Sequence, residues 1–246
     1  MPASFDARDK WNKCPSLREV GEQSNCGSCW ALATAQAITE RTCIATDGKF
    51  TEDLSAQDLL TCCKGLLFAG CGDCCHGGRP YSAWSFWLEH GLVTGGLYYG
   101  NGCQPHSFPP HHHGEGYADT PDCVQTCDNE RDYHKDKHFG KNAYTLITTD
   151  DMRQDILDHG PIGVDFTVYN DFPSYKSGVY QRHSTEELGG HAVKLIGWGE
   201  EDGVPCWLAV NSWNMEWREN GLFKILRGSN HCGIEAHAVA GTPKIE

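Results

Sequence analysis

Two cysteines stand three positions apart in the run QSNCGSCWA, which covers residues 23–31 and contains Cys26 and Cys29. Such a pair can belong to a disulfide framework, a metal site, a redox couple, or a nucleophile beside a structural cysteine. A zinc site needs a second ligand pair, which Cys71 and Cys74 could supply. A redox pair of the thioredoxin type should follow a strand, and no strand pattern precedes Cys26. With fourteen cysteines competing for partners, the sequence favours a divided pair in which Cys26 is structural and Cys29 is a free thiol.

The nucleophile interpretation requires a helix start and a base. In the first turn of a helix, unpaired N–H groups and the positive end of the dipole stabilise a thiolate at Cys29. A base activates such a thiol, and His191 lies among small residues in the run GGHAV. Asn211 could accept a hydrogen bond from the other imidazole nitrogen, and Trp213 would shield that bond from water. These residue types favour a nucleophilic Cys–His–Asn site.

Helices are predicted through the first 90 residues. The run from 29 to about 43 is rich in Ala, Leu and Ile, contains no Gly or Pro, and follows Ser28. A second helix is expected near residues 55–62. A third is expected over residues 80–90, where Gly91 ends it. Cys29 therefore begins a mostly buried helix in a cysteine-rich half of the chain.

The second half has a different pattern. Residues 95 to about 141 are rich in Gly, Pro, His, Asp and Cys with little periodicity, and an irregular segment of that length is usually functional. A short helix is expected over residues 151–159. Strand-like runs then cover residues 163–169, 191–198, 206–213 and 221–227. Helices followed by an antiparallel β half predict two lobes.

Composition narrows the class of protein. The 246 residues carry a formal net charge of −13, which gives a nucleic-acid partner no electrostatic footing. No apolar run is long enough to span a membrane, and the protein is not expected to bind one. Fourteen cysteines indicate a disulfide framework in a secreted or lumenal protein. The first 20 residues contain no apolar signal-peptide core, so the chain is expected to be a mature form.

The motifs resemble those of papain-like cysteine peptidases. CGSCW at 26–30 matches the Cys-Gly-[Ser/Ala]-Cys-[Trp/Tyr] signature of that family, and Gln23, GHA at 190–192 and NSW at 211–213 follow in the family's order. Runs such as LLTCC at 59–63 and HCGIE at 231–235 are similar to the cathepsin B-like subfamily. Cys29 and His191 are separated by more than the roughly 130 to 150 residues usual in the wider family. The excess falls in the irregular segment, where cathepsin B relatives carry an occluding loop.

The resemblance implies an α+β fold with two lobes. It implies a single peptidase unit over residues 1–246, with the active-site cleft between a helical lobe and an antiparallel, barrel-like β lobe. The helical, disulfide-rich lobe would cover residues 13–140, including a shortened occluding loop at about 104–122. Residues 141–246 and an N-terminal strand would form the β lobe.

The same resemblance implies the catalytic roles. Cys29 would attack a peptide carbonyl, His191 would transfer protons, and Asn211 would orient His191. The Gln23 side chain and the Cys29 backbone N–H would form the oxyanion hole. The expected substrate-binding residues are Gly77, Gly78, Pro80, Ala192, Trp213 and His237.

Two positions near the expected substrate pocket depart from the family. His76 replaces an asparagine that precedes the two glycines, and His237 stands where cathepsin B carries an arginine-binding glutamate. Because a protonated histidine repels a guanidinium, we expect the pocket for the second residue before the cut to prefer apolar side chains over arginine.

The occluding loop also departs from its relatives. It reads PPHHHGEG at 109–116 and lacks the two cysteines that close the loop in relatives. His112 and His113 are expected to bind a substrate's C-terminal carboxylate, with Glu22 holding the loop down. A metal site and a solvated loop tip are the alternatives for this histidine run. A loop without its disulfide should open readily and favour endopeptidase activity.

The resemblance also implies a disulfide pattern. The expected pairs leave Cys74, Cys206 and Cys232 without an assignment, beside the free Cys29. Arg218 replaces a usual glycine. The five implied pairs are Cys14–Cys43, Cys26–Cys75, Cys62–Cys123, Cys63–Cys71 and Cys103–Cys127.

The sequence therefore predicts a cysteine endopeptidase with an added dipeptidyl carboxypeptidase activity. The alternative is a weakened peptidase homologue that acts as a binding protein. No cofactor and no metal are expected. Peptide and protein substrates, cystatin-like inhibitors and the removed propeptide are the expected partners of a monomer. A lysosome or an extracellular lumen is the expected location.

Overall fold

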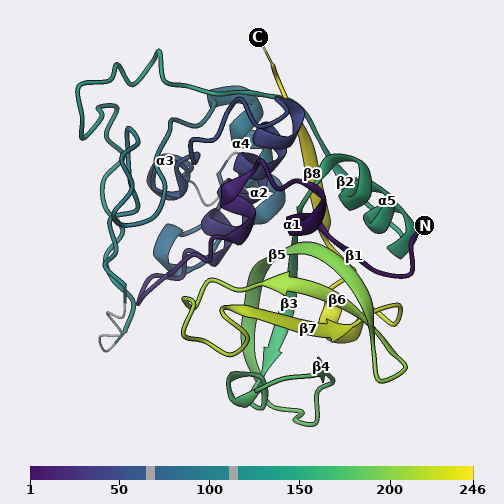
Figure 1. Ribbon diagram of the computed structural model, residues 1–246. Helices are drawn as coiled ribbons and strands as arrows, with labels where there is room; N and C mark the ends of the chain where they lie inside the picture. The colour runs from purple at the N-terminus through teal and green to yellow at the C-terminus, as the bar shows by residue number, and fades with distance from the viewer. Residues whose placement is uncertain (65–69, 111–115, 246) are drawn as a thin grey trace.

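The computed structural model describes residues 1–64, 70–110 and 116–245. Two lobes lie side by side, one helical and one built on a sheet, with the chain crossing between them near both ends (Figure 1). The two-lobe, papain-like arrangement expected from the sequence is confirmed. No helix among the described residues is long and apolar enough to cross a membrane.

Three helices form the helical lobe, at the positions that the sequence predicts. They are α2 (Cys29–Ala45), α3 (Ala56–Cys62) and α4 (Pro80–His90). The Ser55 hydroxyl caps α3 by accepting a hydrogen bond from the Asp58 N–H at 2.9 Å. Proline at the first position begins α4, and Gly91 ends it with a φ of 66°. Helix α2 is buried along nearly its whole length, so it forms the centre of the lobe.

The second lobe is an open eight-stranded sheet in the order β2-β8-β3-β5-β6-β7-β4, with β1 paired to β5. Its inner strands confirm the predicted runs within a few residues. The long β5 extends further than predicted at both ends. The strands are β1 (Phe5–Asp6), β2 (Gly140–Leu146), β3 (Ile162–Tyr169), β4 (Val179–Tyr180), β5 (Glu187–Glu201), β6 (Val204–Val210), β7 (Leu222–Leu226) and β8 (Ala238–Pro243).

The sheet differs from the expected antiparallel barrel in two ways. It does not close, because β2 and β4 end the hydrogen-bonded path without pairing to each other. It is also mixed, since β4 runs parallel to β7 while every other pair is antiparallel. The short 3₁₀ turn η3 (Phe172–Ser174) and the following loop bring β4 back in the parallel direction. A two-residue strand leaves no periodicity from which to predict its direction.

The described residues also form shorter helices and turns. Helix α1 (Ala7–Lys10) follows β1, and α5 (Thr149–His159) begins two residues before its predicted start because Thr148 and Asp151 form a capping box. The remaining 3₁₀ turns are η1 (Pro15–Arg18), η2 (Cys74–His76) and η4 (His231–Gly233).

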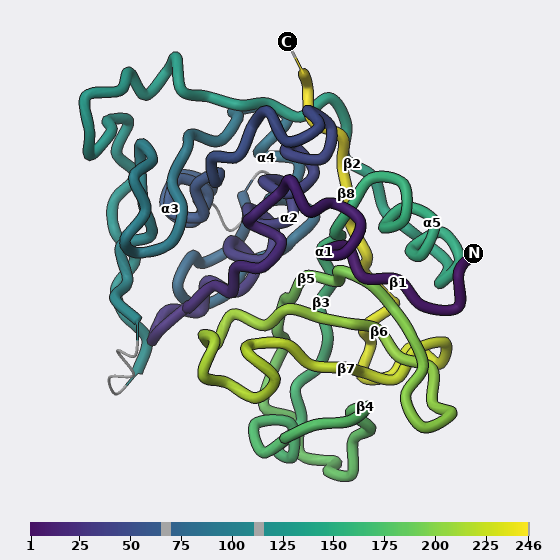
Figure 2. The backbone as a smooth tube through the Cα atoms, in the orientation of Figure 1, coloured from purple at the N-terminus to yellow at the C-terminus, as the bar shows by residue number. Residues whose placement is uncertain are grey.

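Buried ion pairs join α2 to the sheet lobe. Lys194 on β5 donates to Glu40 on α2, and both side chains are almost fully buried. Arg41 donates to Asp155 on α5 and, from Nε, to the Pro161 carbonyl at 2.6 Å. Figure 2 shows the chain ends adding to this connection, since the N-terminal segment runs along the sheet before entering the helical lobe and β8 runs up toward α4. These contacts therefore hold the two lobes together along α2.

The irregular segment before β2 is anchored on the buried Asp58 of α3. The Asp58 carboxylate accepts from the Tyr133 hydroxyl at 2.7 Å, from Lys137 Nζ at 2.6 Å and from the Val93 N–H at 3.1 Å. Five disulfides brace the same lobe, and they are the five pairs that the resemblance implies. These are Cys14–Cys43, Cys26–Cys75, Cys62–Cys123, Cys63–Cys71 and Cys103–Cys127.

Candidate active site

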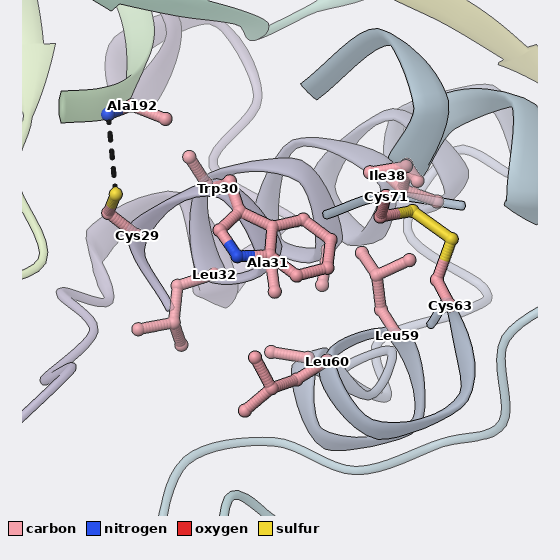
Figure 3. Close-up of a cluster of buried hydrophobic side chains, with 14 of the residues drawn as sticks. Cys29, Trp30, Ala31, Leu32, Ile38, Leu59, Leu60, Cys63, Cys71 and Ala192 are labelled. Atoms are coloured by element: carbon pink, nitrogen blue, oxygen red, sulfur yellow. Dashed lines mark hydrogen bonds between the residues drawn. A yellow bond between two sulfur atoms is a disulfide. The ribbon is translucent and has the colours of Figure 1, made fainter. Parts of the chain in front are cut away.

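Cys29 and His191 meet where α2 begins against β5. Cys29 is the first residue of α2, and its side chain is 9% exposed. The Ala192 N–H, from the residue after His191, donates to Cys29 Sγ at 3.5 Å (Figure 3). The next side chain, Trp30, turns the other way, toward Leu59 and Leu60 in the core of the helical lobe (Figure 3). The thiol therefore points to the lobe interface while its neighbour anchors the helix start.

The environment favours charge separation between the thiol and the imidazole. Burial by itself raises the pKa of the Cys29 thiol, but the His191 charge, a hydrogen bond from that ring and the backbone N–H groups of Ala192 and Trp30 bring the pKa below its ordinary value. Burial likewise lowers the pKa of His191, and the Cys29 charge together with hydrogen bonds to Cys29 and Asn211 raises it above the ordinary value. The pair therefore suits a thiolate beside an imidazolium.

Asn211 fixes the orientation of the imidazole. His191 Nε2 lies 2.7 Å from Asn211 Oδ1, which also accepts the Ser212 N–H at 2.8 Å. Because Oδ1 is the acceptor, Nε2 carries the proton and Nδ1 is the nitrogen left for the thiol. The Trp213 ring centroid lies 5.0 Å from that of His191 and covers the hydrogen bond.

Gln23 is held beside the thiol by both ends of its amide. Its Oε1 accepts from the Ser212 hydroxyl at 2.8 Å, and its Nε2 donates to the Cys26 carbonyl at 3.2 Å. The backbone turns tightly here, because the Gly27 N–H donates to the Cys75 carbonyl at 2.6 Å and a Cβ on Gly27 would lie 2.5 Å from that oxygen. The amide nitrogen of Gln23 is thus presented next to the N-terminus of α2.

A cleft of about 280 Å³ joins these residues. Of the predicted site residues, Gln23, Cys29, Gly77, His191 and Trp213 line it. Gly78, Pro80, Ala192, Asn211 and His237 lie outside this lining. Four further apolar or aromatic residues line the cleft, and none of them carries a reactive group that would mark it in the sequence. They are Tyr117, Val168 of β3, Pro173 and Leu188 of β5.

Glycine is required at Gly77 and at Gly78 for different structural reasons. Gly77 adopts a φ of 110°, which residues with a side chain rarely adopt, and a Cβ there would meet nothing within 4 Å. A Cβ on Gly78 would instead lie 2.4 Å from the Trp30 ring. Gly77 therefore leaves open space at the cleft where a side chain would stand, while Gly78 allows Trp30 to pack.

The departures from the family pattern have defined positions. His76 lines the cleft, and its ring centroid lies 5.5 Å from that of Tyr117 in the irregular segment. Arg218 has a φ of 52°, the conformation that favours glycine, and its guanidinium donates to the Pro173 carbonyl. His237 Nδ1 lies 3.1 Å from Asp165 Oδ1, a partner that the sequence analysis did not foresee.

The expected loop residues are only partly described. His112 and His113 lie outside the described residues. The Glu22 carboxylate accepts from the Ser24 N–H at 3.0 Å and from the Asn214 side chain at 2.5 Å. Cys74, Cys206 and Cys232 are free, like Cys29. Within residues 1–64, 70–110 and 116–245, no group of three or more His, Cys, Asp or Glu side chains is arranged to hold a metal ion.

Comparisons with known proteins agree along the whole chain. A family model described as "Papain family cysteine protease" matches residues 1–242. Cathepsin B-like cysteine proteinase 5 of Caenorhabditis elegans is 47% identical, with 100% of this chain and 75% of the relative covered. Cathepsin B-like cysteine proteinase 4 of the same organism is 44% identical, with 100% and 76% covered.

Solved structures extend the likeness to three dimensions. The structure of proCathepsin B S9 from Trypanosoma congolense is similar with a TM-score of 0.86 and 38% identity, covering 100% of this chain and 78% of that one. Procathepsin L2 proteinase from the Tenebrio molitor larval midgut has a TM-score of 0.74 and 28% identity, with 98% and 68% covered. With a thiol, imidazole and amide aligned at one cleft, the chain belongs to the papain family of cysteine proteases and is a cathepsin B-like cysteine peptidase.

Proposed function

We propose that Cys29, His191 and Asn211 hydrolyse peptide bonds through a thioester. The Cys29 thiolate attacks the peptide carbonyl carbon, and His191 gives its proton to the departing amine as the C–N bond breaks. Water then attacks the thioester carbonyl while His191 accepts its proton, and cleavage of the C–S bond releases the acid and restores the Cys29 thiolate beside the His191 imidazolium. The observation that carries this proposal is the buried Cys29–His191 pair with Asn211 Oδ1 2.7 Å from the ring.

Two donors serve the developing oxyanion in this proposal, Gln23 Nε2 and the Cys29 backbone N–H. Both lie at the N-terminus of α2, where the helix dipole adds to their effect. Each such donor contributes about 3 kcal/mol to transition-state stabilisation in comparable sites. We expect Gln23→Ala to lower kcat by about 10²-fold with a small change in KM. A change confined to KM would contradict this role.

The substrate backbone is proposed to lie along Gly77, with Gly78 behind it. A Cβ on Gly77 would meet nothing within 4 Å, so the space above this residue is open to a peptide. Pro80, Ala192 and His237 are proposed to bound the pocket for the second residue before the cut, with Trp213 on the leaving-group side. At acid pH, a protonated His237 would make this pocket prefer apolar side chains over arginine.

Endopeptidase activity is proposed as the main activity, with dipeptidyl carboxypeptidase activity from the shortened loop at about 104–122. Tyr117 brings this segment to the cleft, and the Ala118 N–H donates to the Asn25 carbonyl at 2.8 Å. His112 and His113 would bind the terminal carboxylate, with Glu22 holding the loop. Replacing both histidines with alanine should remove dipeptide release from a peptide with a free C-terminus while sparing cleavage of an amide-capped peptide. Full dipeptide release would contradict the assignment.

A catalytically weakened binding protein is the competing function. Titration with an epoxysuccinyl inhibitor distinguishes the two, because labelling needs a reactive thiolate at Cys29. We expect one label per chain with parallel loss of hydrolysis. If the unlabelled protein shows no measurable hydrolysis although Cys29 can be labelled, the binding function would be supported instead. Cystatin-like inhibitors, the removed propeptide, a monomeric state and a lysosomal or extracellular location complete the proposal by family likeness.

A further inference from the structure

Asp165 is paired across the sheet with the residue whose N–H contacts the Cys29 thiol. It lies in β3, and its antiparallel partner on β5 is Ala192. Directly opposed residues have side chains on the same face, about 4.5 to 5.5 Å apart at Cβ. The Ala192 N–H is the group that donates to Cys29 Sγ (Figure 3). The Asp165 side chain therefore lies next to Ala192, and the Ala192 N–H in turn contacts the Cys29 thiol.

Alternation along β3 settles which way Asp165 points. Its neighbours Val164 and Phe166 belong to the core of the sheet lobe. Gly163, two residues away and on the same face as Asp165, looks toward the helical lobe, where a Cβ would lie 3.3 Å from Trp84 Nε1 of α4. The Asp165 carboxylate consequently faces the helical lobe, and its side chain is 34% exposed.

The Asp165 carboxylate lies within ion-pair distance of one histidine, His237. His237 Nδ1 lies 3.1 Å from Asp165 Oδ1, and the His237 side chain is 71% exposed just before β8. Within residues 1–64, 70–110 and 116–245 it is the one ion-pair partner of Asp165. Several titratable groups on the elements packed against β3 pair elsewhere, and Cys232 of η4 is a free thiol. The pairs are Lys194 with Glu40, Arg41 with Asp155, His191 with Cys29 and Asn211, Glu187 with Tyr169, and His231 with the Arg182 N–H.

We infer that Asp165 is the acidic specificity residue of the pocket for the second residue before the cut, and that His237 controls its availability. When the imidazole is neutral, the carboxylate accepts an arginine or lysine side chain of the substrate. When the imidazole is protonated, it forms an ion pair with the Asp165 carboxylate. The pocket then binds an apolar side chain of the substrate instead. This inference rests on the proposed function, because it requires a peptide to lie across Ala192.

The physical basis is competition between two cations for one carboxylate. A protonated His237 forms a closed pair with Asp165 and also repels an incoming guanidinium. A neutral His237 leaves a carboxylate with free lone pairs, which a guanidinium can engage through two parallel hydrogen bonds. Imidazole side chains change charge between about pH 5 and 8. The apolar preference expected from His237 alone is thus confined to acid pH.

A pair of matched substrates tests the inference. Both are N-acylated dipeptidyl coumarinamides with arginine next to the scissile bond, and the second residue is arginine in one and phenylalanine in the other. The ratio of their kcat/KM values cancels the titration of Cys29 and His191, which both substrates share. We expect the arginine-to-phenylalanine ratio to rise about tenfold from pH 5 to pH 8, the effect of one charge-assisted contact.

Three variants separate the contributions. Asp165→Asn should hold the ratio low and independent of pH, while His237→Gln should hold it high and independent of pH. Asp150→Asn removes an exposed carboxylate that also has one basic partner, Arg153, but lies on α5 rather than on the β3–β5 pair that carries Asp165. It should follow the native ratio at every pH.

The outcomes distinguish this inference from the proposed function. Inhibitor titration first counts the folded sites in each preparation. If the phenylalanine substrate is hydrolysed but the ratio ignores both Asp165→Asn and His237→Gln, the inference is overturned and the proposed function stands. If neither substrate is hydrolysed by the native chain, the proposed function fails and the inference falls with it.

Discussion

At the scale of single residues, the Cys29 thiol is subject to opposing effects. Burial at 9% exposure disfavours a thiolate, whereas the His191 charge and two backbone N–H groups favour it and prevail. The position of Cys29 at the first residue of α2 adds the helix dipole in the same direction. The thiol is therefore activated by its placement rather than by exposure to solvent.

Asn211→Ala should weaken catalysis by misplacing the imidazole. The loss of the 2.7 Å hydrogen bond frees the ring to rotate, and a misplacement of about 1 Å can cost about 10² in rate. The same bond raises the pKa of His191, so the variant should lose activity at a lower pH on the alkaline limb of its kcat/KM profile. Asn170→Ala, which removes an exposed amide bonded to Glu186 in the same lobe, is the control. An unchanged alkaline limb in Asn211→Ala would contradict the orienting role.

At the scale of elements, the half-buried Asp53, just before α3, interacts with Glu19 of the N-terminal segment. Burial, followed by the charge of Glu19 and a hydrogen bond to it, raises the pKa of Asp53 to about 7. An unfolded aspartate ionises near pH 4. The folded protein therefore keeps a proton that the unfolded chain loses, and the resulting stability is complete below about pH 4 and lost as pH rises toward 7.

Asp53→Asn should reduce this pH dependence. We expect the native protein to melt at a higher temperature at pH 5 than at pH 7.5, and we expect the difference to shrink in the variant, because the amide does not ionise. Glu89→Gln removes an exposed carboxylate from α4 and should melt like the native chain at both pH values. Thermal denaturation monitored by circular dichroism provides the measurement. A difference of equal size in Asp53→Asn would exclude Asp53 as its source.

The helices and strands differ in how well the sequence predicts them. Helices α2 and α4 follow from long runs of helix-forming residues with clear ends, and β3 and β5 follow from alternation. Strands β4 and β8 leave weaker signals, since one has two residues and the other is AVAGTP, with little of the β-branched or aromatic content typical of strands. Their pairing is decided by tertiary contacts, which local sequence does not encode.

The candidate site was predicted unevenly for a similar reason. Cys29, His191 and Asn211 carry reactive groups in distinctive runs, so their types were visible before their geometry. Asp165 was not foreseen, because an aspartate within a strand pattern resembles any solvated position until the register places it opposite Ala192. Specificity residues depend on such cross-strand neighbours, and sequence spacing alone does not reveal them.

At the scale of the whole molecule, the cleft depends on the fixed relation of two lobes. Arg41 connects them, since its guanidinium contacts Asp155 and donates to the Gly241 carbonyl at 2.9 Å and, through Nε, to the Pro161 carbonyl at 2.6 Å. Without the guanidinium, the two carbonyls would lose this donor, and Asp155 would keep the Tyr144 hydroxyl at 2.6 Å but lose its charge partner. The catalytic pair lies across the same interface, with Cys29 on one lobe and His191 on the other.

Arg41→Met should therefore destabilise the protein strongly. Removal of one partner from a buried ion pair costs about 3 to 5 kcal/mol, because the remaining charge loses its counter-charge. Lys13→Met breaks the exposed pair with Asp47 and should leave the free energy of unfolding nearly unchanged. Urea denaturation with disulfides intact compares the two. Similar small losses for both variants would contradict a connecting role for Arg41.

The central claim is that Cys29 is a thiolate paired with the His191 imidazolium, and the pH dependence of Cys29 alkylation tests it most directly. The rate of modification by iodoacetamide, followed by mass spectrometry of the Cys29 peptide, reports the thiolate fraction. We expect rapid alkylation to persist well below the ordinary thiol pKa of about 8.5, and we expect its inflection to move upward in His191→Ala. An inflection near 8.5 in the native protein that His191→Ala leaves in place would contradict the account.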